Sequence, residues 1–175
     1  MRILARICRA VSWLILFVTG SAWGFDNQWH LGAGAGIAAQ ERDPSLGPGF
    51  VIHGAYGLSD LFDARLELLN SWHGSSPMGA ALLGLTYKLD VIQVIPWGGL
   101  AVGGYFFSDA LTGKGRSNFE PGAAALLGID YAWARAWGAS LALGMHFMPL
   151  IEDHRSPLSL RYTTFLLRFE HRWGW

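Results

Sequence analysis

The feature that most constrains the fold is a two-residue alternation that recurs along most of the chain. Between residues 61 and 72, for example, Ala64 and Leu66 alternate with Arg65 and Glu67. Successive side chains of a β-strand point to opposite faces, so this pattern predicts strands with one apolar face and one polar or small face. Eight such segments follow one another, at about 28–39, 49–58, 61–72, 78–89, 93–107, 118–131, 136–148 and 158 to the C-terminus.

The composition indicates that the apolar face of these strands meets lipid. Hydrophobic residues make up 51% of the chain, yet beyond residue 24 no apolar run reaches the ~20 residues that a transmembrane helix needs. High hydrophobicity in short alternating segments is typical of transmembrane strands. An even number of strands closes the sheet and leaves no unpaired edge. The sequence therefore predicts an all-β fold, a closed antiparallel eight-stranded transmembrane β-barrel preceded by a cleavable signal peptide.

Two kinds of connection alternate between the predicted strands. Short turns, such as the one at Ser59-Asp60, alternate with longer polar loops at 40–47, 73–77, 108–117 and 149–157. Transmembrane barrels have short turns on the periplasmic side and longer loops outside. If both termini are periplasmic, the alternation fits every connection, and the longer loops are external.

Residues 1–24 have the pattern of a secretory signal peptide. Arginines lead into a short apolar core at 11–18, and small residues follow it up to Gly24, after which we expect cleavage. The arginines are Arg2, Arg6 and Arg9. The alternative is a membrane-anchoring helix, for which the apolar core is short. The predicted barrel domain is therefore 25–175.

The only cysteine, Cys8, lies within this leader and before its apolar core. A lipoprotein cysteine would follow that core. The mature chain is therefore expected to contain no disulfide, no thiol nucleophile and no cysteine metal ligand.

Charged residues of the predicted strands fall on the face that points into the barrel. A buried charge needs a partner of opposite sign, and an eight-stranded barrel has room for little except side chains. We therefore predict a structural network that fills the lumen; the alternative is a gated small pore or a proton path. The network consists of Asp63, Arg65, Glu67, Lys88, Asp130, Arg168, Glu170 and Arg172.

Depth along the strands predicts how these charges pair. The third strand rises from the periplasm while the eighth descends, which places charges of opposite sign at equal depth. Glycines at 32, 34 and 36 of the strand between them would leave room for the side chains. The expected pairs are Asp63 with Arg172, Arg65 with Glu170, Glu67 with Arg168 and, lower in the barrel, Lys88 with Asp130.

Other candidate sites are weaker. His53 and His146 both point inward on strands that can face each other, and a metal or acid–base pair is conceivable, but ordinary hydrogen-bonded histidines fit better. The sequence His73-Gly74-Ser75 offers histidine and serine in a loop, where a rigid catalytic triad is hard to hold. The glycines of 32–36 are not followed by a helix and a Lys-Ser/Thr pair, so they predict no phosphate loop. We predict no catalytic site, metal or cofactor.

Aromatic residues near strand ends predict girdles at the two membrane interfaces. At the periplasmic end these are Trp29, Trp97, Trp133, Trp137, Trp173 and Trp175. At the other end they are Trp72 and Phe107.

The last residues of the chain alternate between aromatic or apolar and charged side chains and stop on an aromatic. The alternating set is Phe165, Leu167, Phe169, Trp173 and Trp175, with His171 among them. This resembles the C-terminal signal that outer-membrane barrel proteins present to the barrel-assembly machinery. His171 departs mildly from the pattern, because it has lipid-facing parity.

Over 25–175 the chain resembles the small outer-membrane barrels of the outer-membrane protein A, X and W types. The resemblance is one of pattern and carries no diagnostic active-site motif. It implies a location in the bacterial outer membrane, contact with its lipid and lipopolysaccharide, and the barrel-assembly machinery as a partner during biogenesis. The soluble peptidoglycan-binding domain that often follows the protein A barrel is not expected, because this sequence stops at the barrel.

These observations favour a non-enzymatic integral outer-membrane protein with a role in envelope integrity or surface interaction. One alternative is a narrow channel, or a conduit for hydrophobic small molecules as suggested for the protein W type. Another is a lipid A-modifying enzyme, an acylase or deacylase. A soluble lipocalin-like barrel would need its apolar residues inside, which the charge pattern disfavours. The formal net charge is zero, and no basic patch predicts nucleic-acid binding.

Overall fold

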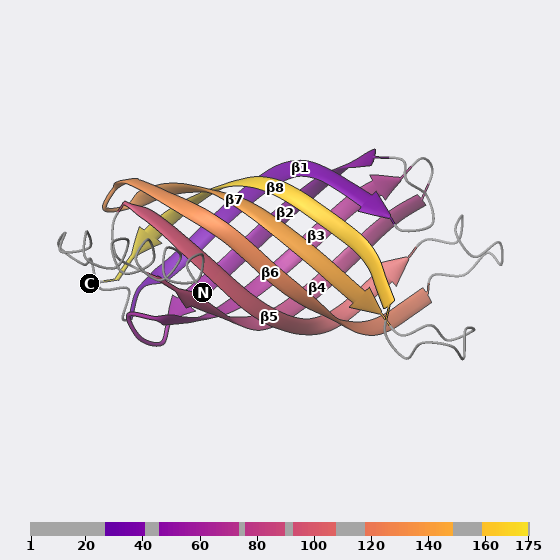
Figure 1. The fold of residues 1–175 in the computed structure, drawn as a ribbon, viewed down its shortest axis with the longest axis horizontal. Coiled ribbons are helices and arrows are strands. Elements are labelled where there is room, and N and C mark those ends of the chain that lie inside the picture. The colour runs from indigo at the N-terminus through magenta and orange to yellow at the C-terminus, as the bar shows by residue number, and fades with distance from the viewer. Residues whose placement is uncertain are drawn as a thin grey trace, which may run out of the picture.

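A computed structural model of the chain is a single closed barrel of antiparallel strands in sequential order (Figure 1). It describes residues 27–40, 46–73, 76–89, 93–107, 118–148 and 159–174. The strands are β1 (Trp29–Gln40), β2 (Leu46–Gly57), β3 (Phe62–His73), β4 (Ser76–Lys88), β5 (Val94–Phe107), β6 (Asn118–Ala134), β7 (Trp137–Met148) and β8 (Ser159–Trp173). The predicted closed antiparallel eight-stranded β-barrel is confirmed.

The barrel closes because β1 pairs with β2 on one side and with β8 on the other. In the β1–β8 register, Trp29 lies opposite Trp173 and Gln40 opposite Tyr162. The chain therefore enters and leaves the barrel at the same end, which we call the termini end; the opposite end is the distal end. Closure lets neighbouring strands satisfy backbone hydrogen bonds all round the barrel, which lipid cannot do.

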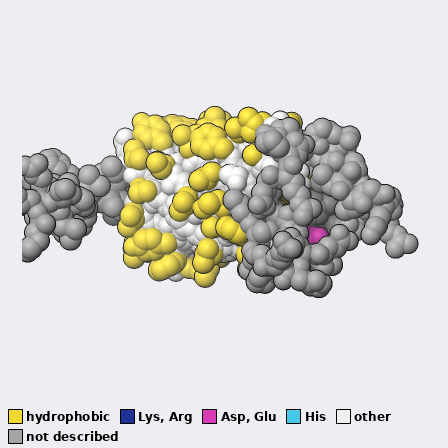
Figure 2. Space-filling model, turned by 45° about the vertical axis from the view of Figure 1, so that its right-hand side comes forward, with side chains coloured by type: hydrophobic (Ala, Val, Ile, Leu, Met, Phe, Trp, Pro, Cys, Tyr) yellow, Lys and Arg dark blue, Asp and Glu magenta, His cyan; other side chains and the backbone are white. Residues whose placement is uncertain are grey.

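The outer face of the barrel is apolar. Side chains at alternate positions stand exposed, among them Leu100 at 73% and Leu83 at 61%. Figure 2 shows hydrophobic side chains along the described wall, with no Lys, Arg or His among them in this view. A soluble lipocalin-like barrel would have the reverse arrangement, so this alternative is excluded. No helix in the described ranges is long and apolar enough to cross a membrane.

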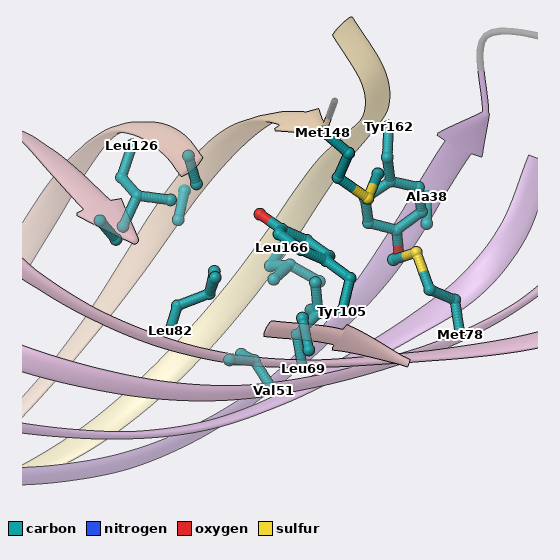
Figure 3. Packing of buried hydrophobic residues seen from close by; sticks show 14 of the residues in the cluster. Ala38, Val51, Leu69, Met78, Leu82, Tyr105, Leu126, Met148, Tyr162 and Leu166 are labelled. Carbon is teal, nitrogen blue, oxygen red and sulfur yellow. The ribbon is translucent and has the colours of Figure 1, made fainter. Parts of the chain in front are cut away.

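The inner face is divided into two layers along the barrel axis. Charged side chains fill the half nearer the termini end. Apolar and aromatic side chains fill the distal half and point toward one another across the lumen (Figure 3). This apolar layer consists of Ala38, Val51, Leu69, Met78, Ala80, Leu82, Ala101, Tyr105, Ala124, Leu126, Ala142, Met148, Tyr162 and Leu166, and Trp97 joins the same cluster.

Strand bounds differ from the predicted ones mainly at the distal end. β2 begins at Leu46 and β4 at Ser76, whereas the sequence predicts starts near 49 and 78. Both differences involve a proline, Pro48 or Pro77, that continues the ladder at a strand end, where a missing N–H is tolerated. Only residues 74 and 75 separate β3 from β4, so the predicted longer connection is wrong there.

The sixth strand is also longer than predicted. β6 runs to Ala134, past a register shift between Ala132 and Ala134, and the turn comes at Arg135-Ala136. The sequence predicts a turn over 132–135, between the strands expected at about 118–131 and 136–148. A β-bulge adds a residue to one strand without ending its pairing, which explains the difference.

A closed barrel of this kind should resist dodecyl sulfate until it is heated. We expect the unboiled protein to migrate differently from the boiled protein in gel electrophoresis. A closed sheet has no unpaired edge strand at which unfolding could begin at a low free-energy cost. A sample unfolded in urea before loading is the control and should migrate as the boiled sample does. Identical mobility of all three samples would contradict closure.

Candidate functional site

The lumen of the barrel holds every charged residue that the sequence predicts there. Inward positions of β3 and β8 carry six of them, and β4 and β6 carry one each. Their relative exposure ranges from 0% for Asp63 and Lys88 to 3% for Glu67 and Arg172. Four are cationic and four are anionic, so the eight formal charges sum to zero. Charges buried to this degree are tolerated only when they are paired.

Glu67 is the centre of the first group of ion pairs. Its carboxylate accepts hydrogen bonds from both terminal nitrogens of Arg168, at 2.6 and 3.3 Å. Arg65, two residues away on the same strand, donates to it at 3.5 Å. The paired geometry with Arg168 fixes both side chains in orientation as well as in charge.

Glu170 is the centre of the second group. Its Oε1 accepts a hydrogen bond from Nε of Arg172 at 2.7 Å and a closer contact from the Nη2 of that residue. Two imidazoles face the carboxylate from neighbouring strands, His53 at 3.5 Å and His30 at 3.8 Å. Arg172 also reaches Asp130, at 3.6 Å. One carboxylate of β8 is therefore surrounded by groups from β1, β2 and its own strand.

The third ion pair joins Lys88 of β4 to Asp63 of β3. Both side chains are fully buried at the termini end of the barrel. Neighbouring strands bring them together.

One of the predicted ion pairs is present in the lumen, and several residues also form ion pairs that were not predicted. Glu67 with Arg168 forms as predicted. The partners of the other charged residues are Lys88 for Asp63, Glu67 for Arg65, and Glu170 and Asp130 for Arg172. Strands in a barrel are tilted and staggered, so residues counted to equal depth are not opposite each other, and long arginine side chains reach a carboxylate on their own strand.

Trp97 lies in the lumen, which corrects its predicted place in the outer girdle. Its side chain is 4% exposed and donates a hydrogen bond from Nε1 to Asp130 at 2.5 Å. The guanidinium of Arg65 lies over the ring, 4.4 Å from its centroid, and that of Arg168 lies at 5.8 Å. A Cβ at Gly128 would collide with the indole, so glycine is needed there to leave room for it. Trp97 therefore joins the charged layer to the apolar layer.

The sequence contained the signal for this position. Trp97 shares its parity with Ala101, which is buried in the lumen, and not with Leu100 and Val102, which are exposed outside. Proximity to a strand end suggested an interface girdle, but alternation decides which face a side chain takes.

His53 and His146, the two histidines considered as a possible metal or acid–base pair, belong to different groups. His53 faces Glu170, as described above, whereas Nδ1 of His146 lies 3.0 Å from the Tyr105 hydroxyl and its Nε2 lies 3.3 Å from the Thr164 hydroxyl. Ring contacts with Tyr105 and Tyr162 enclose His146 in the apolar layer. Within the described ranges, no three His, Cys, Asp or Glu side chains gather as metal ligands.

Side chains of β8 reach across β1 to the strands beyond it. In the β1–β8 register, Gly32 lies opposite Glu170 and Gly34 opposite Arg168. A Cβ at Gly34 would lie 2.6 Å from a carbonyl oxygen of β8 and 2.8 Å from the Arg168 side chain. Because Gly32 and Gly34 have no side chains, Arg168 can reach over β1 to Glu67 on β3. The charged network therefore connects strands on both sides of the joint between β1 and β8.

Apart from Trp97, the predicted girdle and C-terminal residues are on the outer face where their side chains are described. Exposed side chains at the termini end are Trp29, Trp133, Trp137 and Trp173, together with Phe165, Leu167 and Phe169 further along β8. Trp72 is exposed near the distal end.

Several predictions lie outside the described residues. These are the leader 1–24, Trp175, the loop 149–157, Gly74-Ser75 and the side chains of His73 and Phe107. They stay predictions.

No family model and no curated protein matches this sequence. Solved structures do match its fold. Neisserial surface protein A has 15% sequence identity and a TM-score of 0.63, with 83% of this chain and 97% of that chain covered. The N-terminal barrel domain of OprF from Pseudomonas aeruginosa has 11% identity and a TM-score of 0.66, with coverage of 85% and 98%. Ail, the attachment invasion locus protein of Yersinia pestis, has 13% identity and a TM-score of 0.55, with coverage of 85% and 99%.

The fold is that of the small outer-membrane barrels. These matches span nearly the whole of each solved chain, and at such low identity they establish the fold alone. Together with the apolar exterior, they agree with the predicted location of this chain in the bacterial outer membrane.

Removing the carboxylate of Glu67 should destabilise the barrel strongly. Glu67→Leu leaves two buried guanidiniums without their shared partner, and breaking a buried pair costs about 3–5 kcal/mol in free energy of unfolding. The double variant Glu67→Leu/Arg168→Leu should lose less than the sum of the single losses. Unfolding by guanidinium chloride in lipid vesicles measures the free energy of unfolding of each variant.

Asn70→Ala is the matched control for this series, because Asn70 is on β3 but exposed on the lipid face. Its effect should stay within about 0.5 kcal/mol. A Glu67→Leu variant as stable as this control would contradict the pairing.

Trp97→Ala should also cost far more than the loss of an outer indole. Emptying a packed site of this size costs about 3–5 kcal/mol. Trp133→Ala, on the lipid face of the neighbouring β6, is the matched control and should cost clearly less. Equal losses in the same unfolding experiment would show that Trp97 is not packed in the lumen.

Proposed function

We propose that this protein is a non-conducting, non-enzymatic outer-membrane barrel with a role in envelope integrity or surface interaction. The observation that carries the proposal is the filled lumen. A water-filled passage would leave inward side chains exposed to it, yet Arg168, Tyr105, Leu82 and Leu166 are each at most 1% exposed.

The apolar layer and the charged layer of the lumen would each block the passage of a solute. The few polar groups of the apolar layer, such as the Tyr105 hydroxyl and the His146 ring, bond to one another and are poor replacements for the water of an ion. The charged layer next to it has its charges paired internally. A solute would have to break the Glu67–Arg168 pair and separate Tyr105 from His146 as well. With the interior filled, the outer wall and the two ends of the barrel are what remains for contact with other molecules.

Known proteins of this fold support a surface role. Ail is an attachment invasion locus protein and has also been solved with the heparin analogue sucrose octasulfate. This chain shares the barrel and little sequence with it, so the likeness supports the class of role and names no ligand.

A conduit for hydrophobic small molecules is the second candidate, and the apolar layer of the distal half favours it. Such a molecule would have to displace the methionine and tyrosine side chains there and leave sideways, because the charged layer closes the way below. Uptake of an apolar dye by vesicles with and without the barrel tests it, and equal uptake would exclude it.

The purified protein should give no discrete conductance steps in planar bilayers bathed in potassium chloride. The triple variant Tyr105→Ala/Leu166→Ala/Arg168→Ala, checked for its heat-dependent gel mobility, should conduct, because it removes side chains from both layers. Steps from the unaltered protein would overturn the proposal. Changed lipid A acylation in cells that carry the protein would overturn its non-enzymatic part.

A further inference from the structure

Indole side chains at the termini end gather on one half of the barrel. The outward residues there are Trp133 on β6, Trp137 on β7, Trp173 on β8 and Trp29 on β1, which are four consecutive strands of the closed sheet. The other four strands have Tyr56, Phe62, Tyr87 and Val94 at this end, where their described residues include no outward tryptophan, because Trp97 of β5 points into the lumen. The aromatic girdle as a whole extends further round the barrel, because tyrosines also lie at membrane interfaces, but its indoles at this end are confined to this half.

An imidazole lies at the centre of these indoles. The ring of His171 is 4.6 Å from that of Trp137, edge to face at 70°, and 5.6 Å from that of Trp173, nearly parallel at 28°. Trp29 lies opposite Trp173 in the β1–β8 register, and its ring centroid is 4.7 Å from that of Tyr56. We call Trp29, Trp137, His171 and Trp173 the indole patch.

The charges beside the patch differ from those on the other half. The tight turn that joins β6 to β7 places exposed Arg135 between Trp133 and Trp137 in sequence. The turn between β2 and β3, on the half without indoles, places exposed Asp60 at the same end. The patch therefore combines electron-rich rings, a hydrogen-bond acceptor and a neighbouring guanidinium.

We propose that the indole patch binds the headgroup of a zwitterionic phospholipid with a primary ammonium group, phosphatidylethanolamine being the occupant. Ring faces attract an ammonium, and a neutral imidazole nitrogen accepts a hydrogen bond from its N–H. Arg135 pairs with the phosphate of the same headgroup. The acyl chains then lie along the exposed side chains of Leu31 and Phe169.

This chemistry ranks the common headgroups. A choline group is attracted to the rings but has no N–H to donate to His171. A glycerol headgroup has no cation for the rings at all. The order of binding is therefore ethanolamine, then choline, then glycerol, and this specificity goes beyond the surface role proposed above.

Native mass spectrometry of the full-length barrel in detergent, with equimolar phosphatidylethanolamine, phosphatidylcholine and phosphatidylglycerol of identical acyl chains, tests this order. We expect ethanolamine lipid to be retained about two- to five-fold over glycerol lipid, the ratio that exposed cation–π contacts give. His171→Leu should lower ethanolamine retention to the choline level. Trp137→Leu/Trp173→Leu should abolish the preference of both over glycerol lipid.

Trp72→Leu, which removes an exposed indole near the distal end, is the matched control and should change nothing. Arg135→Gln should weaken retention of all three lipids alike. Equal retention of the three lipids by the unaltered protein overturns the proposal without any variant, so it stays testable if a variant fails to fold. An equal loss of preference in Trp72→Leu overturns the assignment to this patch.

Discussion

The constraint on which the structure depends is that lipid offers no hydrogen-bond partner to the backbone. Each strand must therefore find both neighbours, and β1 must meet β8. The alternation of side chains follows from that ladder, because a residue that does not face lipid has only the lumen to face. In a barrel of eight strands the lumen is narrow, so inward residues must fill it and also satisfy one another.

The glycines of β1 show how the two demands are met together. They hold the joint between the first and last strands free of side chains on the inside, and Arg168 extends over that joint to Glu67. The network thus connects strands that are far apart in sequence at the place where the barrel closes. Paired charges there are directional, which an apolar filling would not be.

The fold could be predicted from sequence because alternation is a local signal that records the environment of each face. The strand count, the inward placement of the charges and the outward aromatic residues of β8 all follow from parity. What parity cannot supply is the stagger between strands, and the partners of Arg65 and Arg172 depend on it. The one-sided distribution of indoles also needed the order of strands around the barrel. Trp97 is a different case, since its parity was available and proximity to a strand end was weighted above it.

The balance of charges in the lumen also matters for forces that act across a membrane. Four cationic and four anionic side chains cancel, with the histidines counted as neutral. A potential difference between the two sides does work only on net charge that moves through it. Moving the network as a rigid unit along the barrel axis would therefore gain or lose almost nothing from such a field.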